Sequence, residues 1–197
     1  AGVVSGPVST WPLSTGDLME VLDADPAGLS PAARQAISRL RKRLDQATVT
    51  GRVRFSGHVS AAEHPREIRT FSSDARESGE IGLGLEWTGQ RFAARLRGQW
   101  VNDPDDNKDW RADGSYLGMA LGNWMLAAST SERHWGPGWQ SSMILSNNAR
   151  PIPAFTLDRN LTTPFENRWL RWMGPWDLSF LWGFLDDDRE VPNARVF

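Results

Sequence analysis

The spacing of hydrophobic positions divides the chain into two parts. Over residues 1–47 they recur every three or four positions, which is typical of amphipathic helices. Ser14 and Ser30 stand where helix N-caps are expected, and Pro31 suits the first helical position. From residue 49 onward, apolar and polar residues alternate, which predicts β-strands with one apolar face. We therefore predict an extended segment and two helices in residues 1–47, and a β-structure in residues 48–197.

Two glycine-containing dipeptides predict tight hairpins between these strands. The strands are expected at 49–60, 80–87, 91–100 and 176–184, among others. Gly89–Gln90 and Gly122–Asn123 fit two-residue type II′ turns. The first closure would pair Trp87 with Phe92, and the second would pair Leu121 with Trp124. Both closures place apolar residues opposite apolar residues.

The connections between strands fall into two length classes. The two hairpin turns are minimal, whereas residues 61–79 and 102–114 form long, highly charged connections. Short turns on one side and long loops on the other are typical of outer-membrane barrels. The fold class that we predict is mainly β: an antiparallel up-and-down transmembrane β-barrel, with a long irregular insertion at 131–175. A soluble β-sandwich, whose apolar faces would meet inside, stays open as an alternative.

Composition narrows the kinds of partner. The chain has no run of 18 apolar residues, which excludes a membrane-spanning helix but not spanning strands. A net charge of -2 gives no reason to expect nucleic acid, and the absence of cysteine excludes disulfides and thiolate metal sites. The three histidines share no metal-ligand spacing, so we predict neither a metal nor a cofactor. Eleven tryptophans against one tyrosine favour surroundings with one apolar and one wet side, such as protein interfaces and membrane belts. Together with the barrel prediction, this makes outer-membrane lipid an expected partner.

The polar face of the predicted strands is rich in arginine. If the apolar face contacts lipid, this face lines a lumen that would attract anions. The residues expected to line it are Arg52, Arg54, His58, Arg91, Arg95 and Arg97. The alternative is that these side chains pair with inward-facing acids and with whatever fills the barrel.

No catalytic constellation stands out. His134 lies near Ser141 and Ser142, but neither serine has the G-x-S-x-G pattern of a nucleophile elbow. The aspartates at 186–188 lack the spacing of an EF-hand calcium loop and fit a solvated strand end. We therefore predict no catalytic residues, and an outer-membrane hydrolase remains only a second alternative.

One long segment resembles a known family. "HWGPGWQSSMILSNNARPIPAFTLDRN", followed by "PFENRWLRWMGPW" and "FLDDDREVPNA", is similar to the signature region of the capsule assembly protein Wzi family, and "SGPVSTWPLSTGDL" resembles that family's start. The resemblance implies a large barrel in the bacterial outer membrane, with its N-terminal helices on the periplasmic side or plugging the barrel. It also implies a non-enzymatic lectin that organises capsular polysaccharide. Family barrels are longer, so we expect this chain to be a fragment with an unpaired strand edge near residue 197.

The same segment offers the chemistry of a carbohydrate site. Aromatic faces stack on sugars, and amide, carboxylate or guanidinium groups pair with hydroxyls and uronates. The polysaccharide-binding candidates are Trp135, Trp139, Asn147, Asn148, Arg150, Asp158, Arg159 and Asn160. These residues could equally belong to a proline-rich turn that satisfies buried backbone groups. At the level of function, a porin or polysaccharide export channel is the first alternative.

Overall fold

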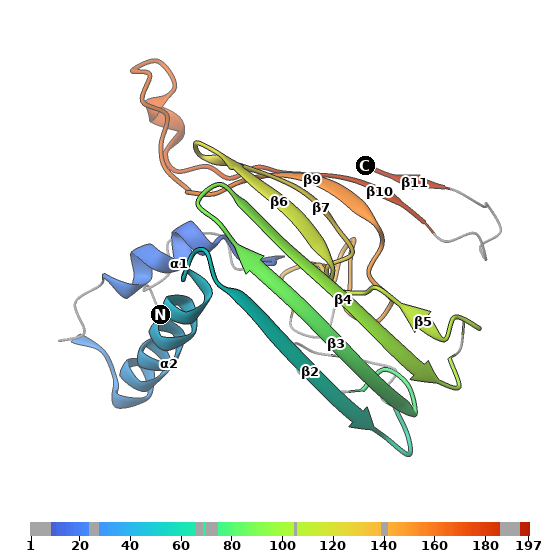
Figure 1. Ribbon diagram of the computed structural model, residues 1–197. Coiled ribbons are helices and arrows are strands. Elements are labelled where there is room, and N and C mark those ends of the chain that lie inside the picture. The colour runs from blue at the N-terminus through green and yellow to red at the C-terminus, as the bar shows by residue number, and fades with distance from the viewer. Residues whose placement is uncertain are drawn as a thin grey trace.

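The computed structural model describes residues 9–23, 28–65, 69, 75–104, 106–138, 142–185 and 194–197 (Figure 1). The helices of this part are α1 (Thr15–Leu22), α2 (Pro31–Ala47) and a 3-10 turn, η2 (Arg171–Met173). The strands are β1 (Thr10–Trp11), β2 (Val53–Ala61), β3 (Gly79–Thr88), β4 (Phe92–Asn102), β5 (Trp110–Arg111), β6 (Tyr116–Leu121), β7 (Trp124–Ser129), β8 (His134–Trp135), β9 (Ala154–Arg159), β10 (Ser179–Phe184) and β11 (Arg195–Val196).

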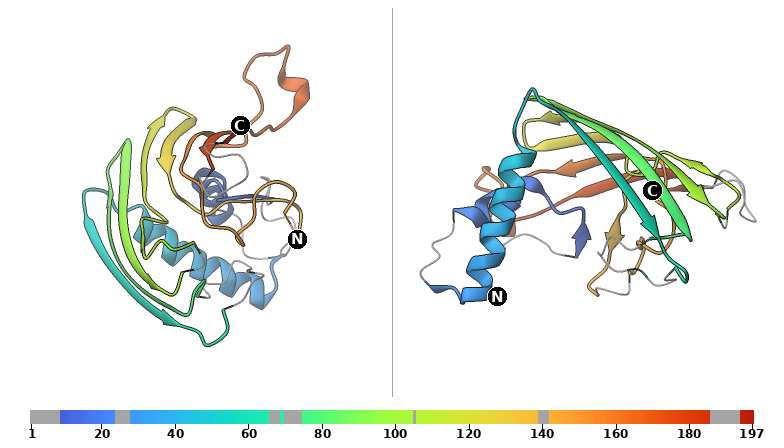
Figure 2. Two further views of the ribbon diagram at one scale, coloured as in Figure 1. Left: turned by 90° about the vertical axis from the view of Figure 1, so that its right-hand side faces the viewer. Right: turned by 60° about the horizontal axis from the view of Figure 1, so that its bottom comes forward.

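Nine of the strands form one antiparallel sheet. The order is β11-β10-β9-β7-β6-β4-β3-β2, and β5 pairs with β4 beside this path. Neighbours on this path follow one another along the chain except where β5, beside the path, and β8, in a second sheet with β1, intervene. This order confirms the up-and-down arrangement. The sheet curves strongly, with one concave and one convex face (Figure 2). Within the described residues it is open, because β2 and β11 lie at opposite edges.

The two predicted hairpins have different outcomes. The closure at Gly122–Asn123 is confirmed, because Leu121 pairs with Trp124 and Gly122 has a φ of 60°. The closure at Gly89–Gln90 is wrong by two residues, because Trp87 pairs with Ala94 and the Gly89 N–H donates to the Phe92 carbonyl at 2.7 Å. The turn is therefore centred on residues 90–91. A shift of two leaves every side chain on its predicted face, so the alternating pattern could not detect it.

The apolar face of the sheet is the convex one, and it is exposed. Phe55, Val59 and Leu83 are 82%, 78% and 73% exposed, whereas Leu44, Val101, Ala154 and Leu181 are the buried apolar residues described. A soluble sandwich would cover such a face with a second sheet, and no described element does so. The sandwich alternative is therefore wrong for this part of the chain.

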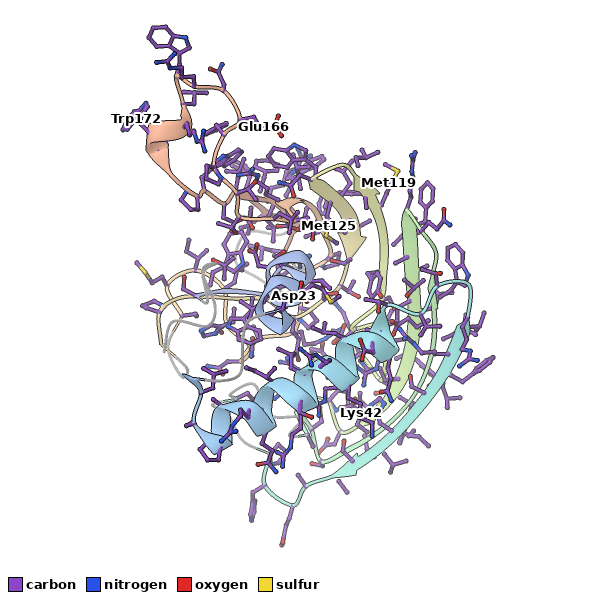
Figure 3. The ribbon with its side chains drawn as sticks, turned by 90° about the vertical axis from the view of Figure 1, so that its left-hand side faces the viewer. Asp23, Lys42, Met119, Met125, Glu166 and Trp172 are labelled. Carbon is purple, nitrogen blue, oxygen red and sulfur yellow. The ribbon has the colours of Figure 1, made fainter. Side chains whose placement is uncertain are left out.

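The concave face is covered by the N-terminal segment and by residues 130–153. The helices α1 and α2 lie on this side near the short turns, as the positions of Asp23 and Lys42 show (Figures 2 and 3). The predicted N-caps are confirmed: the Ser30 Oγ accepts from the Ala33 N–H at 3.2 Å, and the Ser14 Oγ from the Asp17 N–H at 3.3 Å. None of the helices described is long and apolar enough to cross a membrane.

The stretch 131–175, expected to be irregular, contains β9. This strand lies between β7 and β10, so the stretch is two excursions separated by a sheet strand. Residues 130–153 leave the sheet at the end that carries the long loops 62–78 and 103–115, here called the long-loop end. Residues 160–178 leave at the opposite end, beside the Gly122 turn, here called the short-turn end. A long connection at the short-turn end departs from the predicted sorting of loops.

Candidate functional site

A charged cavity of about 480 Å³ lies on the concave face toward the long-loop end. Four arginines and three carboxylates line it, together with His58 and smaller residues: Arg69, Arg76, Arg97, Arg111, Glu80, Asp113 and Glu132. The floor comes from β2, β3 and β4, whose polar positions point to one face because strand side chains alternate. The roof comes from the long loops and residues 130–153.

Arg97 is the least compensated cation in this charged cavity. Its Nη2 lies 3.1 Å from both ring nitrogens of His58, and the described residues give its guanidinium no carboxylate partner. The His58 Nε2 in turn lies 2.5 Å from the Glu80 Oε1. Gly82 faces His58 across the strands, where a Cβ would come within 2.1 Å of the imidazole, so glycine makes room for the ring.

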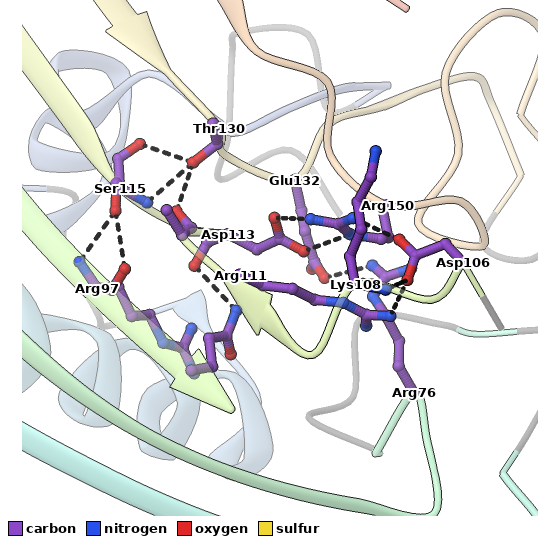
Figure 4. A network of polar contacts seen from close by, with 12 residues as sticks. Arg76, Arg97, Asp106, Lys108, Arg111, Asp113, Ser115, Thr130, Glu132 and Arg150 are labelled. Atoms are coloured by element: carbon purple, nitrogen blue, oxygen red, sulfur yellow. Dashed lines mark hydrogen bonds and ion pairs between the residues drawn. The ribbon is translucent and has the colours of Figure 1, made fainter. Parts of the chain in front are cut away.

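An ionic network closes the long-loop end of the cavity (Figure 4). Arg111 donates to Glu77 and to Asp106, each at 2.9 Å, and its side chain is only 3% exposed. Arg150 donates to both carboxylate oxygens of Asp113, at 3.0 and 2.9 Å, and also pairs with Asp106 at 2.5 Å. Segments from three connections of the chain are thereby joined above the sheet.

The charges of this network are fixed by their partners. Burial acts to raise the pKa of Asp106, but hydrogen bonds from Arg150 and Arg111 outweigh it and lower that pKa to about 2. Hydrogen bonding to Asp113 raises the pKa of Arg150 despite burial. The pKa of Glu132 is lowered because hydrogen bonding to Arg76 outweighs its burial. Asp106 and Glu132 therefore stay ionised at neutral pH.

Glu132 joins a second pair of segments. It accepts from Arg69 at 3.2 Å and from Arg76 at 2.7 Å, which ties these two residues to the excursion that carries Glu132. It also lines a second cavity of about 540 Å³, between the N-terminal segment and strands β6–β10. The two cavities therefore adjoin at Glu132. The aromatic side chains of the second cavity are Trp11, Tyr116 and Trp135.

The eight predicted polysaccharide candidates do not form one site. Asn148 and Arg150 lie at the long-loop end: the Asn148 Oδ1 accepts from the Arg69 N–H at 2.8 Å. Asn147 is buried, and Trp139 lies outside the described residues. Trp135 belongs to β8, which pairs with β1 so that Thr10 faces Trp135. Two of the four stretches that carried the family resemblance are thus paired with each other.

The remaining three candidates lie at the short-turn end. Asp158 and Arg159 are consecutive in β9, and both line the second cavity, as Trp135 does. The Arg159 guanidinium stacks 3.6 Å from the centre of the Trp176 ring and donates to two carbonyls. The Asn160 side chain accepts from the Gly16 N–H at 3.3 Å. Arg159 and Asn160 thus make contacts within the protein, and their role in binding a sugar stays a prediction.

The predicted lumen-lining residues also divide. Arg54, His58, Arg95 and Arg97 lie on the concave face of β2 and β4, and Arg54 and Arg95 both pair with Glu86. Arg52 precedes β2 and Arg91 lies in the turn, and both are exposed. The charged residues of this region that the sequence pattern did not predict are Glu77, Asp106, Arg111 and Glu132. Only the density of charge in the long loops could have drawn attention to them.

The structure describes only some of the residues that were considered for catalysis, so the prediction of no catalytic residues stays a prediction. His134 is buried, and its Nε2 lies 2.8 Å from the Gly138 carbonyl oxygen. Ser141 and the aspartates at 186–188 fall outside the described residues. Within the residues described, no three metal-ligating side chains gather at one point.

Comparison with known proteins identifies the family. The capsule assembly protein Wzi family matches residues 49–197. An uncharacterized 55.8 kDa protein of the cps region of Klebsiella pneumoniae is 25% identical over 197 residues, which are 99% of this chain and 38% of that protein. The solved structure of Wzi from Escherichia coli, an outer membrane protein involved in group 1 capsule assembly and a carbohydrate-binding β-barrel, is 25% identical with a TM-score of 0.78, over 98% of this chain and 44% of that one.

The chain therefore spans less than half the length of both relatives. Its open antiparallel sheet corresponds to part of a barrel in the second of them. The family match covers well over half of the chain and agrees with the resemblance seen in the sequence. The chain belongs to the capsule assembly protein Wzi family.

Proposed function

We propose that this chain is part of a non-enzymatic, polysaccharide-binding protein of the bacterial outer membrane that holds capsular polysaccharide at the cell surface. The convex face contacts lipid, the long-loop end faces the surface, and the N-terminal helices face the periplasm. The exposed apolar convex face and the loop lengths support this orientation. The relatives support the role, since one of them is a carbohydrate-binding barrel involved in capsule assembly.

The observation that carries the proposal is the position of Arg97 in the charged cavity. A guanidinium recognises a carboxylate through two parallel hydrogen bonds, and most arginines nearby already have such a partner. Among the described side chains, the Arg97 guanidinium has a polar contact only with His58, so its remaining N–H groups can bind a uronate. We therefore assign the charged cavity, and Arg97 within it, to an acidic sugar of the capsule.

The ionic network favours a binding protein over a channel. A porin needs a continuous water path along the concave face, and a sugar-binding barrel does not. Ion pairs cross-link the long loops above the charged cavity (Figure 4). Toward the short-turn end, the N-terminal helices lie over the same concave face (Figure 2). We expect low conductance when the complete protein is placed in a planar bilayer.

Binding of a uronate-containing capsular oligosaccharide to the complete protein in detergent tests the assignment. The Arg97→Gln variant should lower affinity about tenfold, because one charge-assisted hydrogen-bonded pair is lost. The same oligosaccharide with its carboxyl groups reduced to alcohols should bind both proteins alike. Isothermal titration calorimetry measures each affinity.

Arg54→Gln is the matched control. Arg54 lies on the same face but is neutralised by Glu86, so its loss should change affinity less than about twofold. Equal losses in the two variants would refute the assignment to Arg97. A loss in Trp135→Ala alone would move the site to the second cavity. High conductance together with no polysaccharide binding would refute the proposed function itself.

A further inference from the structure

The connection between β9 and β10 carries an exposed aromatic tip. Residues 164–175, here called the tryptophan loop, project from the short-turn end away from the concave face, and both Trp172 and Glu166 lie in the part that stands clear of the sheet (Figures 2 and 3). Trp169 and Trp172 are 84% and 82% exposed, and Met173 is about half exposed. A folded protein has no reason to hold two tryptophans in water unless they meet another surface.

The base of the tryptophan loop is rigidly held. Phe165 stacks on Trp176 with ring centres 4.5 Å apart. The Arg159 guanidinium also lies over the Trp176 ring, 3.6 Å from its centre. The Arg159 Nη1 donates to the Trp176 carbonyl at 2.8 Å, and the Asn123 Nδ2 donates to the Leu161 carbonyl at 3.0 Å. The loop is thus fixed to the Gly122–Asn123 turn as well as to its own stem.

The tip is folded as well as exposed. The Asn167 Oδ1 accepts from the Trp169 N–H at 3.0 Å, and the Asn167 carbonyl accepts from the Arg171 N–H at 3.0 Å. The chain then makes the turn η2 and ends it at Gly174, whose φ is 73°. An exposed hydrophobic tip that is already ordered loses little conformational entropy when it binds.

We propose that the tryptophan loop is an interfacial anchor that lies in the phospholipid headgroup layer at the short-turn end of the sheet. This inference rests on the proposed outer-membrane location. Tryptophan favours the membrane interface because its ring is apolar and its N–H is polar. Arg168 and Arg171 are exposed beside the tryptophans and can pair with lipid phosphate.

Continuity with the convex face favours lipid over a protein partner. The convex ends of the neighbouring strands at this level expose Phe92, Leu121, Leu178 and Phe180, which are 46% to 53% exposed. The proposed lipid-facing band therefore reaches the strand ends from which the tryptophan loop projects. Lipid that contacts this band brings headgroups to the level of the short turns.

Site-specific fluorescence quenching tests the anchor, and the absence of cysteine in this chain makes single labels simple. Met173→Cys, Leu83→Cys and Ser38→Cys are made in the complete protein, with any cysteine outside this chain replaced by serine. Each is labelled with the NBD fluorophore and reconstituted into phosphatidylethanolamine vesicles containing some phosphatidylglycerol. Met173 lies in the loop, Leu83 on the convex face, and Ser38 on an exposed position of α2.

Lipids with a spin label at the headgroup or deep in the acyl chain then report the depth of each position. We expect the label at 173 to be quenched more by the headgroup label, the label at 83 more by the deep label, and the label at 38 by neither. Changing both Trp169 and Trp172 to serine should reduce quenching at 173 about threefold or more, since the two anchoring rings are lost.

The outcomes separate this inference from the proposed function. If position 83 is quenched and position 173 behaves like position 38, the anchor is refuted and the membrane location stands. If position 173 is shielded from water but unquenched by lipid, a protein surface covers the loop and the inference is also overturned. If position 83 is unquenched as well, the proposed location fails.

Discussion

Arg111 holds the long-loop end together, and its removal should release that end without unfolding the sheet. Its guanidinium is 3% exposed and lies between Glu77, 10% exposed, and Asp106. Arg111→Met keeps most of the side-chain volume and removes the charge. Asp106 keeps Arg150, but Glu77 is left buried beside no cation among the described residues.

An unpaired buried charge costs about 3 kcal/mol, which is a shift of about 100-fold in the local opening equilibrium. Hydrogen exchange of the Val101 N–H reports this local opening. The Val101 N–H donates to the Asp109 carbonyl at 2.8 Å, next to the pairing of β5 with β4, and is protected while that pairing is intact. We expect exchange at Val101 to accelerate by about that factor. Exchange at Leu96, in the middle of the β3–β4 pairing, should change little.

The double variant Glu77→Met/Arg111→Met separates charge from packing. Because it leaves no uncompensated carboxylate at Glu77, it should exchange more slowly at Val101 than Arg111→Met alone. The reasoning is refuted if the double variant is at least as fast as the single one. Equal acceleration at Val101 and Leu96 would also refute it, since the whole sheet would then be destabilised.

Three further outcomes are expected. The pKa of Asp106 lies below its ordinary value, so its ion pairs stabilise the long loops fully above about pH 4 and lose this contribution as the pH falls toward 2; Asp106→Asn should flatten the pH dependence of exchange at Val101. Gly122→Ala should cost about 1 kcal/mol or more of unfolding free energy in urea titrations because of its positive φ, whereas Gly98→Ala, equally uncrowded but without a positive φ, should cost much less. Asp17→Asn should speed hydrogen exchange in α1 about tenfold, because Asp17 accepts from the Thr162 N–H at 2.8 Å and the Thr162 hydroxyl at 2.6 Å, and Asp23→Asn, at an exposed position, should not.

Some features follow from local rules and could be predicted. Ser14 and Ser30 begin helices because a serine oxygen satisfies free N–H groups of the first turn. Gly122 fixes a hairpin because glycine adopts a positive φ without steric cost. β9 was missed because it is short and follows a proline-rich stretch, so six residues of alternation did not stand out.

The alternation of apolar and polar residues determined by itself which face of each strand meets which surroundings, because that property depends only on a period of two along the chain. The sequence by itself also indicated the family, because the motifs that resemble it occur in order along the chain. Which charges meet was decided by the tertiary structure. Arg111 and Asp106 come from the connection between β4 and β6, whereas their partners Glu77 and Arg150 come from two other connections. Electrostatic pairing acts over a few ångströms in space, so only the curvature of the sheet and the return of the long loops over it could select the partners.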